Sequence, residues 1–405
     1  MRHRWLAATA AAATCVAIAA CDGTTRHAVA PPVTTQPTAA ASAGVSSAPA
    51  TPPSATPSAS ISGAAPSAPA AKSAASSTAV ATTAKASATA ARPSSGVTHA
   101  APPPPAKAPT SDVLAGTRCQ IFPGDNYWHA DIRGLPVNAH SAQWLAAMGA
   151  STRKLHPDFG PSDGAQPVPY GIPITVAPGG HTRVSVAFDY SDESDHLGYP
   201  LGGDTAIEGG PNADGDRHAI VVTADTCELF ETYDTRSTAT GWTAGSGAHW
   251  SLASDALRPD GWTSADAAGL PILPGLLRCD EVAAGHVDHA IRFTTNLTDA
   301  SHVWPARHDA SSHHDPSLPP MGARFRLKAS FDISRYSAQT QVVLRAMQTY
   351  GLVLADNGSP WYFQGSADSG WPDPLISQLK TIPASAFEAV DVSGLEVSAS
   401  SGAAR

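Results

Sequence analysis

Aromatic side chains are missing from a long part of this sequence. Residues 22–116 contain no Phe, Trp or Tyr and consist almost entirely of Ala, Pro, Ser and Thr. Such a segment cannot bury enough apolar surface to offset the conformational entropy that folding would cost. We therefore expect residues 22–116 to be a disordered tether, which would span on the order of 50 to 60 Å as a flexible coil.

Several signatures of catalysis and cofactor binding are missing as well. The sequence has no P-loop and no Rossmann glycine fingerprint, and no HExxH or CxxC spacing. These absences lower the expectation of a kinase, a dehydrogenase or a zinc enzyme. The sequence predicts a protein that requires no cofactor.

Basic residues are scarce beyond the tether. Residues 1–118 hold 8 of the 25 Lys and Arg residues and 2 of the 34 Asp and Glu residues, so the rest of the chain carries a net charge of about −15. A negative surface repels nucleic acid and anionic lipid. We expect a neutral or cationic ligand and no nucleic-acid partner.

The first 21 residues resemble the leader of bacterial lipoproteins. A positively charged start is followed by an Ala-rich apolar run, residues 6–20, which is too short to span a bilayer as a stable helix. The run ends in Ile18-Ala19-Ala20-Cys21, which resembles a lipobox, and this implies that Cys21 is lipidated and becomes the mature N-terminus. An ordinary signal peptide cut near the same place is the alternative. Both interpretations place the protein outside the cytoplasm, and the lipobox predicts an anchor on the outer face of the cell membrane.

The composition changes abruptly at about Thr117, and every aromatic residue except Trp5 lies beyond the tether. We expect one folded domain over residues 117–394 and a disordered tail over residues 395–405. Short alternating runs, separated by Gly, Pro, Asn and Asp, indicate a mainly β domain of the sandwich or jelly-roll type with a few short helices, rather than a parallel sheet. The expected strands are residues 172–176, 183–190, 218–222, 227–233, 249–252, 287–294, 303–305, 325–331 and 352–355.

Three helices are expected from their capping residues. Asn138 can cap a helix over residues 139–148, and Ser337 can cap one that ends at Gly351. Asp373 opens a third helix that runs through Lys380.

Three phrases of the sequence carry a resemblance over most of residues 119–391. The phrases are CQIFPGDNYW at residues 119–128, WTSADAAGLP at 262–271 and ADNGSPW at 355–361. They resemble an uncharacterised family of secreted bacterial proteins. The resemblance implies no activity, so no functional role follows from it.

Three cysteines remain once the leader is set aside. In an oxidising compartment, Cys119, Cys227 and Cys279 allow one disulfide and one free thiol. We favour Cys119–Cys227, because this bond would join the start of the domain to its central hairpin, while the other two pairings stay open.

An acidic, glycine-rich loop precedes the central hairpin. The stretch EGGPNADGDRH, residues 208–218, reads as a tight loop that leads into a strand, a turn at residues 223–226 and a second strand. With that turn, His218 would face Glu231 and Asp216 would face Tyr233 on one side of the sheet. The alternative is a solvated sheet face or a salt-bridged pair.

Paired carboxyl groups are what glycoside hydrolysis needs, since one protonates the leaving oxygen and the other attacks or activates water. We expect Asp216 and Glu231 to supply this pair, with Glu208 as a substitute for either and His218 orienting them. The acidic run 192–195, which includes Glu193, could lie at the mouth of the same site.

The same loop also resembles the start of a calcium site. Asn212, Asp214 and Asp216 alternate with Gly215 between the last two, as oxygen ligands do in calcium loops. The bidentate glutamate of an EF-hand is absent, because Thr223 stands at its position. Calcium is therefore the one cofactor that the sequence allows for, through a simpler site at Asn212 and Asp214.

Tryptophans beside Gly, Pro or Asp provide a second signal for carbohydrate, because indole faces stack on sugar rings while nearby polar side chains bind hydroxyls. The expected substrate-binding residues are Tyr233, Trp262, Asp266, Trp304, Arg307, His308, Asp356 and Trp361.

The sequence therefore favours an enzyme: a monomeric cell-surface glycoside hydrolase that cleaves an extracellular polysaccharide and meets the membrane only through its N-terminal lipid. A non-catalytic carbohydrate-binding lipoprotein is the first alternative. A polysaccharide lyase is the second, although its anionic substrate would suit the negative charge poorly.

Overall fold

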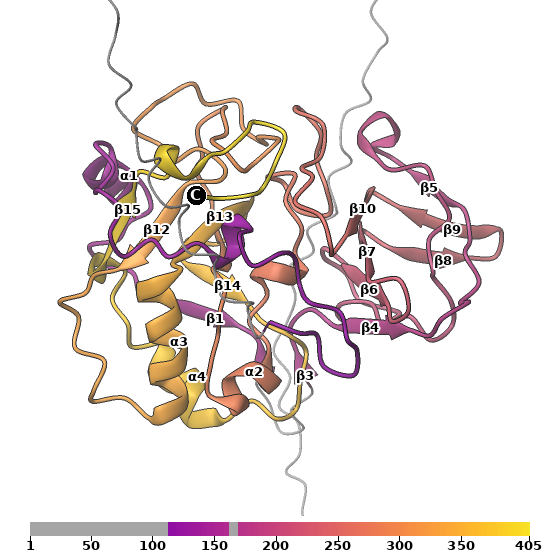
Figure 1. Cartoon of the computed structure of the whole chain (residues 1–405), viewed down its shortest axis with the longest axis horizontal. Coiled ribbons are helices and arrows are strands. Elements are labelled where there is room, and N and C mark those ends of the chain that lie inside the picture. The colour runs from indigo at the N-terminus through magenta and orange to yellow at the C-terminus, as the bar shows by residue number, and fades with distance from the viewer. Residues whose placement is uncertain (1–111, 162–168) are drawn as a thin grey trace, which may run out of the picture. The chain divides into compact units, whose positions relative to one another are not determined.

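The computed structural model describes residues 112–161 and 169–405 (Figure 1). The predicted leader, the lipidation site at Cys21 and residues 22–111 of the predicted tether lie outside the described residues. Within these residues, no helix combines the length and the apolar character that a membrane span requires.

The domain is mainly β, as predicted. Its largest sheet has six strands in the order β1 (His156–Asp158), β14 (Tyr362–Gln364), β11 (Ile291–Thr295), β13 (Leu352–Asn357), β12 (Arg324–Leu327) and β15 (Phe387–Val390). A second sheet has the order β10 (Ser246–Ser251), β7 (Glu228–Tyr233), β6 (Ala219–Thr223) and β4 (Ile174–Ala177). The smaller sheets consist of β5 (Val186–Phe188), β9 (Gly241–Ala244) and β8 (Arg236–Thr238), and of β2 (Gly160–Pro161) with β3 (Pro169–Tyr170).

Parallel pairs occur beside the antiparallel ones, which the sequence did not predict. Strand β11 pairs in parallel with β13, β1 with β14, β4 with β6 and β5 with β9. Parallel neighbours need long connections, and the chain between β11 and β13 includes both β12 and a helix. Strand composition alone does not reveal such crossovers. The expected strand at residues 303–305 is a turn instead.

Short helices cover parts of the six-stranded sheet. The α-helices are α1 (Ser141–Ala147), α2 (Cys279–Ala284), α3 (Ala338–Thr349) and α4 (Asp373–Leu379), and the 3-10 turns are η1 (Tyr127–His129), η2 (Ser191–Glu193), η3 (Leu273–Gly275), η4 (Ala384–Ala386) and η5 (Ser393–Leu395). Ser337 caps α3 as predicted, since its side chain accepts a hydrogen bond from the Thr340 amide. Helix α2 was missed because its N-cap residue is Arg278, which is not a typical cap.

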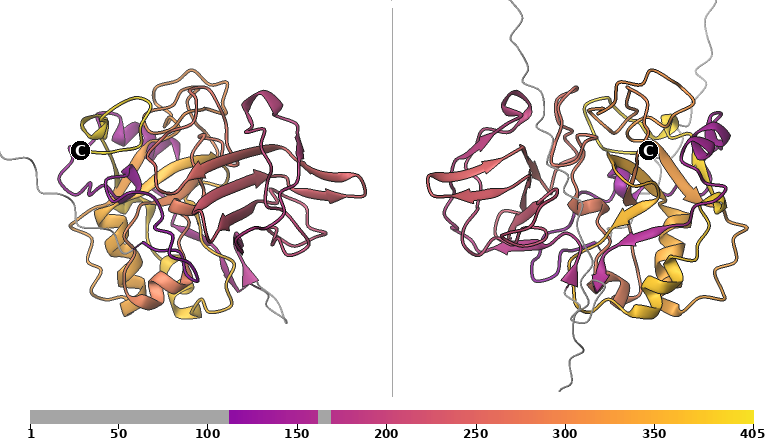
Figure 2. Two further views of the ribbon diagram at one scale, coloured as in Figure 1. Left: turned by 45° about the vertical axis from the view of Figure 1, so that its right-hand side comes forward. Right: turned by 180° about the vertical axis from the view of Figure 1, so that it is seen from behind.

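The hairpin of β6 and β7 lies between two hydrophobic cores. Ile220, Val222 and Leu229 belong to the main core, while Val221 and Phe230 belong to a smaller core under β5 and β9. Figure 1 shows this sheet between the six-stranded sheet and the strands β5, β8 and β9, and Figure 2 gives two further views of the same arrangement. Apolar cover on both faces explains why the sequence of β6 is apolar throughout instead of alternating.

The register of this hairpin differs from the predicted one by two residues. Ile220 pairs with Glu231 and Val222 pairs with Leu229, so His218 is not opposite Glu231. The turn is longer than expected, because Cys227 adopts a left-handed conformation with a φ of 53° and β7 begins only at Glu228. A shift of two keeps each side chain on its predicted face. The ring centroids of His218 and Tyr233 accordingly lie 5.9 Å apart.

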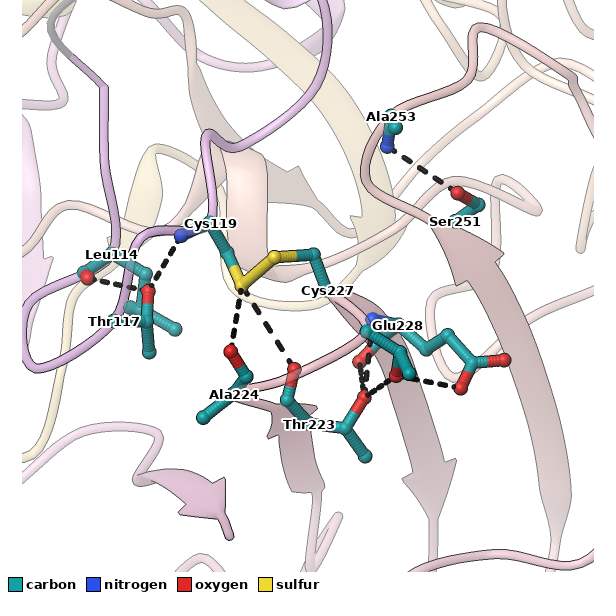
Figure 3. The surroundings of a disulfide bond; sticks show 10 residues. Leu114, Thr117, Cys119, Thr223, Ala224, Cys227, Glu228, Ser251 and Ala253 are labelled. Atoms are coloured by element: carbon teal, nitrogen blue, oxygen red, sulfur yellow. Dashed lines mark hydrogen bonds between the residues drawn. A yellow bond between two sulfur atoms is a disulfide. The ribbon is translucent and has the colours of Figure 1, made fainter. Parts of the chain in front are cut away.

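A disulfide joins Cys119 to Cys227, the pairing that we favoured (Figure 3). It connects the entrance of the domain to the turn of the central hairpin, across 108 residues of sequence. Cys279 is a free, half-buried thiol.

Both predicted ends of the domain require correction. Asp112 and Leu114 are buried, so the domain starts before residue 117. At the other end, the expected disordered tail is part of the fold, because Ala403 bridges Asn126 and the Gly402 carbonyl accepts a hydrogen bond from the Tyr127 amide. The tail has few apolar side chains and is held through its backbone, which a composition-based prediction does not register.

Candidate active site

A polar pocket of about 320 Å³ lies where β7, β10 and β13 meet four other segments, at residues 190–193, 216, 263–267 and 308–310. Asp216 precedes β6, Tyr233 ends β7 and Ser246 begins β10. The lining residues are Tyr190, Glu193, Asp216, Tyr233, Ser246, Thr263, Ser264, Ala265, Asp266, Ala267, His308, Ala310, Asp356 and Asn357. The pocket thus gathers carboxyl groups from four separate segments.

A buried arginine links two of these carboxyl groups. The Arg292 guanidinium donates hydrogen bonds to both oxygens of Asp266, and it lies 3.6 Å from Asp356. Burial first, and then the neighbouring Asp266 carboxylate, raise the pKa of Asp356 to about 8, although Arg292 acts in the opposite direction. Asp356 is therefore a protonated acid at neutral pH, beside the Asp266 carboxylate that Arg292 engages through both oxygens.

A β-bulge directs Asp356 toward the pocket. In the pairing of β11 with β13, Phe293 faces Leu354 and Thr294 faces Asp356, so Ala355 is the extra residue. Bulges of this kind re-aim a side chain and often lie beside active sites.

The segment that carries Asp266 is a loop without regular structure, residues 263–272, which we call the Asp266 loop. Within it, the Ser264 hydroxyl accepts a hydrogen bond from the Asp266 amide and donates one to the Leu270 carbonyl. Gly269 makes the turn, with a φ of 68°, and a Cβ there would come within 2.4 Å of the Trp262 carbonyl oxygen. The compact turn presents Asp266 to both Arg292 and the pocket.

His218 lies behind the pocket and is protonated. Its Nδ1 is 2.6 Å from the Glu208 carboxylate and its Nε2 is 3.1 Å from the Ala265 carbonyl oxygen. Both partners only accept, so both ring nitrogens must carry a proton. Burial by itself would lower the pKa of His218, but the hydrogen bond and charge of Glu208 outweigh it and raise the pKa.

Glu208 is the matching anion. Burial acts to raise the pKa of Glu208, but the hydrogen bond and charge of His218 prevail and lower it. Glu208 and His218 therefore form a charged pair, and neither side chain lines the pocket.

Glu231 is fully buried and does not reach the pocket, which corrects its expected role as half of the catalytic pair. Its two oxygens accept hydrogen bonds from the adjacent amides of Ile272 and Leu273, each at 2.8 Å. Burial raises the pKa of Glu231 to about 7, against the effect of these two amides. Glu231 therefore holds the backbone at Ile272 and Leu273 in place and has no access to a substrate.

Five of the expected site residues do meet in the pocket. Asp216, Tyr233, Asp266, His308 and Asp356 all line it. Glu193, from the acidic run singled out in the sequence, lines it too. Burial first, and then the nearby carboxylates of Asp216 and Asp234, raise the pKa of Tyr233, so its phenol remains a hydrogen-bond donor.

The expected tryptophans do not line the pocket. Trp361 is fully buried among Phe293, Phe325 and Phe387, and its indole donates to the Met148 carbonyl. Tryptophan in a β domain more often serves the core than a ligand, and that preference prevails at Trp361.

Trp304 and Trp262 also have structural partners. The Trp304 indole N–H donates a hydrogen bond to the Ser401 carbonyl. The Arg258 guanidinium lies over the Trp262 ring, with its central carbon 5.5 Å from the ring centroid. Arg307 donates to the carbonyls of Arg258 and Ala399. Their expected contacts with substrate therefore have no support in the geometry.

The side chain of Arg217 organises the acidic loop, residues 208–218. The Arg217 guanidinium donates to the carbonyls of Gly210, Ala213 and Thr235. Asn212 and Asp214 are exposed beside it. Across residues 112–161 and 169–405, no three His, Cys, Asp or Glu side chains converge as they would around a metal ion.

Sequence reasoning missed Arg292, which is central to the site. The available signal was a charged residue between Ile291 and Phe293 in an expected strand, since an arginine is rarely buried without a carboxylate partner. Its partner Asp266 is near in space but 26 residues away in sequence. Ser246, Thr263 and Ser264 carried no signal that distinguishes them from other loop residues.

No family model matches this chain, and the searches of the curated proteins and of the solved structures found no match either.

Proposed function

We propose that the pocket is the active site of a glycoside hydrolase that acts on an extracellular polysaccharide. One observation carries the proposal: a carboxyl group that is protonated at neutral pH shares a pocket with other carboxylates. Hydrolysis of a glycosidic bond needs one carboxylic acid to protonate the leaving oxygen and one carboxylate to attack or to activate water.

The surroundings of the carboxyl groups assign the roles. Asp356 is the general acid, since burial and Asp266 keep its proton in place. Asp266 is engaged by Arg292 through both oxygens, so its lone pairs are occupied. Asp216 is exposed in the same pocket, with no side-chain partner found for it in the described part of the chain, and it is the better nucleophile or base.

The lining also supports this class over the alternatives. A carbohydrate-binding protein would be expected to present tryptophan faces, whereas the aromatic lining consists of Tyr190 and Tyr233. A lyase would bind a uronic acid, which the carboxyl groups of this pocket would repel. Neutral or cationic glycans suit the pocket better.

The experiment compares reducing-end release from a panel of neutral and amino-sugar polysaccharides by the wild type and by two variants. Asp356→Asn and Asp216→Asn keep shape but remove the titratable group, so the rate should fall about 100-fold to 10,000-fold. Asp225→Asn is the matched control, because Asp225 is exposed in the turn at the opposite end of the hairpin from Asp216.

Full activity of both pocket variants on a substrate that the wild type cleaves would show that the roles are assigned wrongly. Cleavage of no glycan, together with retained binding to one, would favour the carbohydrate-binding alternative.

A further inference from the structure

Two buried side chains of the central hairpin contact the Asp266 loop from behind. Glu231, in the middle of β7, accepts hydrogen bonds from Ile272 and Leu273 at the end of the loop. His218, at the entrance to β6, contacts the Ala265 carbonyl near the start of the loop. Asp266 lies between these two anchor points.

The two anchors hold opposite kinds of backbone group. The Glu231 carboxyl oxygens accept hydrogen bonds from two amide N–H groups, and His218 donates one to a carbonyl, so each end of the loop is held by a buried side chain. The loop has no helix or strand of its own over residues 263–272, so these bonds fix where its backbone lies.

The loop in turn sets the environment of the acid. Asp266 engages Arg292 through both oxygens, and this keeps Arg292 at 3.6 Å from Asp356 instead of in a direct hydrogen bond with it. If the loop moved, Asp266 would withdraw and Arg292 would be free to pair with Asp356. A chain of contacts therefore runs from the hairpin through the loop to the acid.

We propose that Glu231 and His218 are positioning residues that hold the Asp266 loop in place, so that Asp266 occupies Arg292 and keeps it from pairing directly with Asp356. The inference deepens the proposed function, because it concerns the same pocket. It explains why a carboxyl group and an imidazolium are buried where neither lines the pocket. A buried polar group is costly unless it is hydrogen-bonded, and both are: His218 to Glu208 and Ala265, and Glu231 to the amides of Ile272 and Leu273.

Two measurements that need no substrate test the inference. The first is hydrogen exchange of the amides of Ile272 and Leu273, and the second is the titration of Asp356 followed by the carbon NMR signal of its carboxyl group. Glu231→Gln keeps the shape of the side chain but replaces one oxygen by an NH2 group. That group can only donate, so one of the two backbone amides loses its acceptor. We expect the exchange of that amide to become about tenfold faster or more, and Asp356 to titrate at a lower pH than in the wild type.

A matched control lies on the same strand. Glu228→Gln changes the same residue type at the half-buried start of β7, where Glu228 pairs with Arg183 and His249. This variant should leave the exchange of Ile272 and Leu273 and the titration of Asp356 unchanged. His218→Gln provides a second test, with faster exchange expected at Ala265 and Asp266, should Glu231→Gln fail to fold.

The inference is overturned if folded Glu231→Gln and His218→Gln variants show the wild-type titration of Asp356. It is also overturned if the loop amides exchange as in the wild type. Because neither measurement involves a glycan, a protein without glycosidase activity would refute the proposed function and leave this test intact. Where activity is found, Glu231→Gln should lower kcat more than it raises KM, and the alkaline limb of the pH profile should move to lower pH.

Discussion

The Arg292 guanidinium donates hydrogen bonds to both carboxylate oxygens of Asp266, at 2.6 and 2.9 Å, and neither side chain is more than 2% exposed. The two residues come from a strand of the six-stranded sheet and from the loop that the central hairpin holds. This pair therefore joins β11 of the six-stranded sheet to the Asp266 loop.

Removing one partner of this pair should destabilise the protein strongly. Arg292→Met leaves the Asp266 carboxylate buried without its partner, and we expect the free energy of unfolding to fall by about 3–5 kcal/mol. Urea denaturation followed by tryptophan fluorescence measures it. The control is Arg133→Met, because the pair of Arg133 with Asp131 is exposed and its loss should cost about 0–1 kcal/mol. Equal losses in the two variants would contradict the prediction.

Stability should decrease as the pH rises from 5 to 9. Burial raises the pKa of Glu231 from 4.5 to about 7, and burial with the charge of Asp266 raises that of Asp356 to about 8. In this window the native state keeps protons that the unfolded chain releases, so the free energy of unfolding falls with pH. Glu231 alone should contribute on the order of 3 kcal/mol.

The raised pKa of His218 acts in the same direction, because its contribution is lost as the pH rises through the folded value. The lowered pKa of Glu208 acts at the acid end, where its contribution is lost as the pH falls. Urea denaturation at a series of pH values measures the slope, which should be shallower in Glu231→Gln. A stability that rises between pH 5 and pH 9 would refute these assignments.

Loss of the disulfide should lower stability without altering the pocket. Replacing Cys119 and Cys227 by Ser removes a cross-link between distant residues, and we expect a loss of about 2–5 kcal/mol. Thermal unfolding with and without a reductant measures the effect. Cys279→Ser is the control, because this thiol is free, and burial raises its pKa to about 11, which makes it a poor nucleophile. A reductant that leaves the wild-type Tm unchanged would count against the cross-link.

Two aromatic residues of similar expected role should behave differently. Trp361→Phe removes core volume and the hydrogen bond to Met148, so we expect a stability loss of roughly 1–3 kcal/mol and little change in substrate affinity. Tyr233→Phe removes only a hydroxyl at the pocket, so stability should change by about 0.5 kcal/mol or less while KM rises. Calorimetry and steady-state kinetics separate the two. The reverse pattern would restore Trp361 as a ligand contact.

Local signals in the sequence were sufficient for much of the fold. A β-branched apolar run and the turn residues after it located the strands of the central hairpin, and Ser337 and Asp373 marked the starts of α3 and α4. The register was not accessible, because the left-handed conformation of Cys227 lengthens the turn and no residue pattern signals it. Crossovers such as that between β11 and β13 are equally invisible to patterns of a few residues.

The candidate site was predictable in part. Asp216 and Tyr233 follow from the hairpin, and Asp266, His308 and Asp356 were chosen as polar neighbours of the tryptophans expected to stack on sugar. What failed was the sorting of roles. Glu231 lies on the sheet face that the sequence predicts. That face is covered by residues 263–272, which pack there through tertiary contacts, so Glu231 meets this loop instead of solvent. Burial decides the role of an acid, and burial is not a local property of the sequence.

The disulfide near the start of the domain has a mechanical consequence. A force that pulls on the chain ahead of Cys119 is passed through a covalent bond to Cys227, at the turn of the central hairpin. The segment between these cysteines, which includes Asp216 and His218, cannot be drawn out by that pull while the bond is intact. A force applied from the N-terminal side therefore bypasses the acidic loop. It reaches β7 at the end next to the turn, and Tyr233 lies at the opposite end of the same strand.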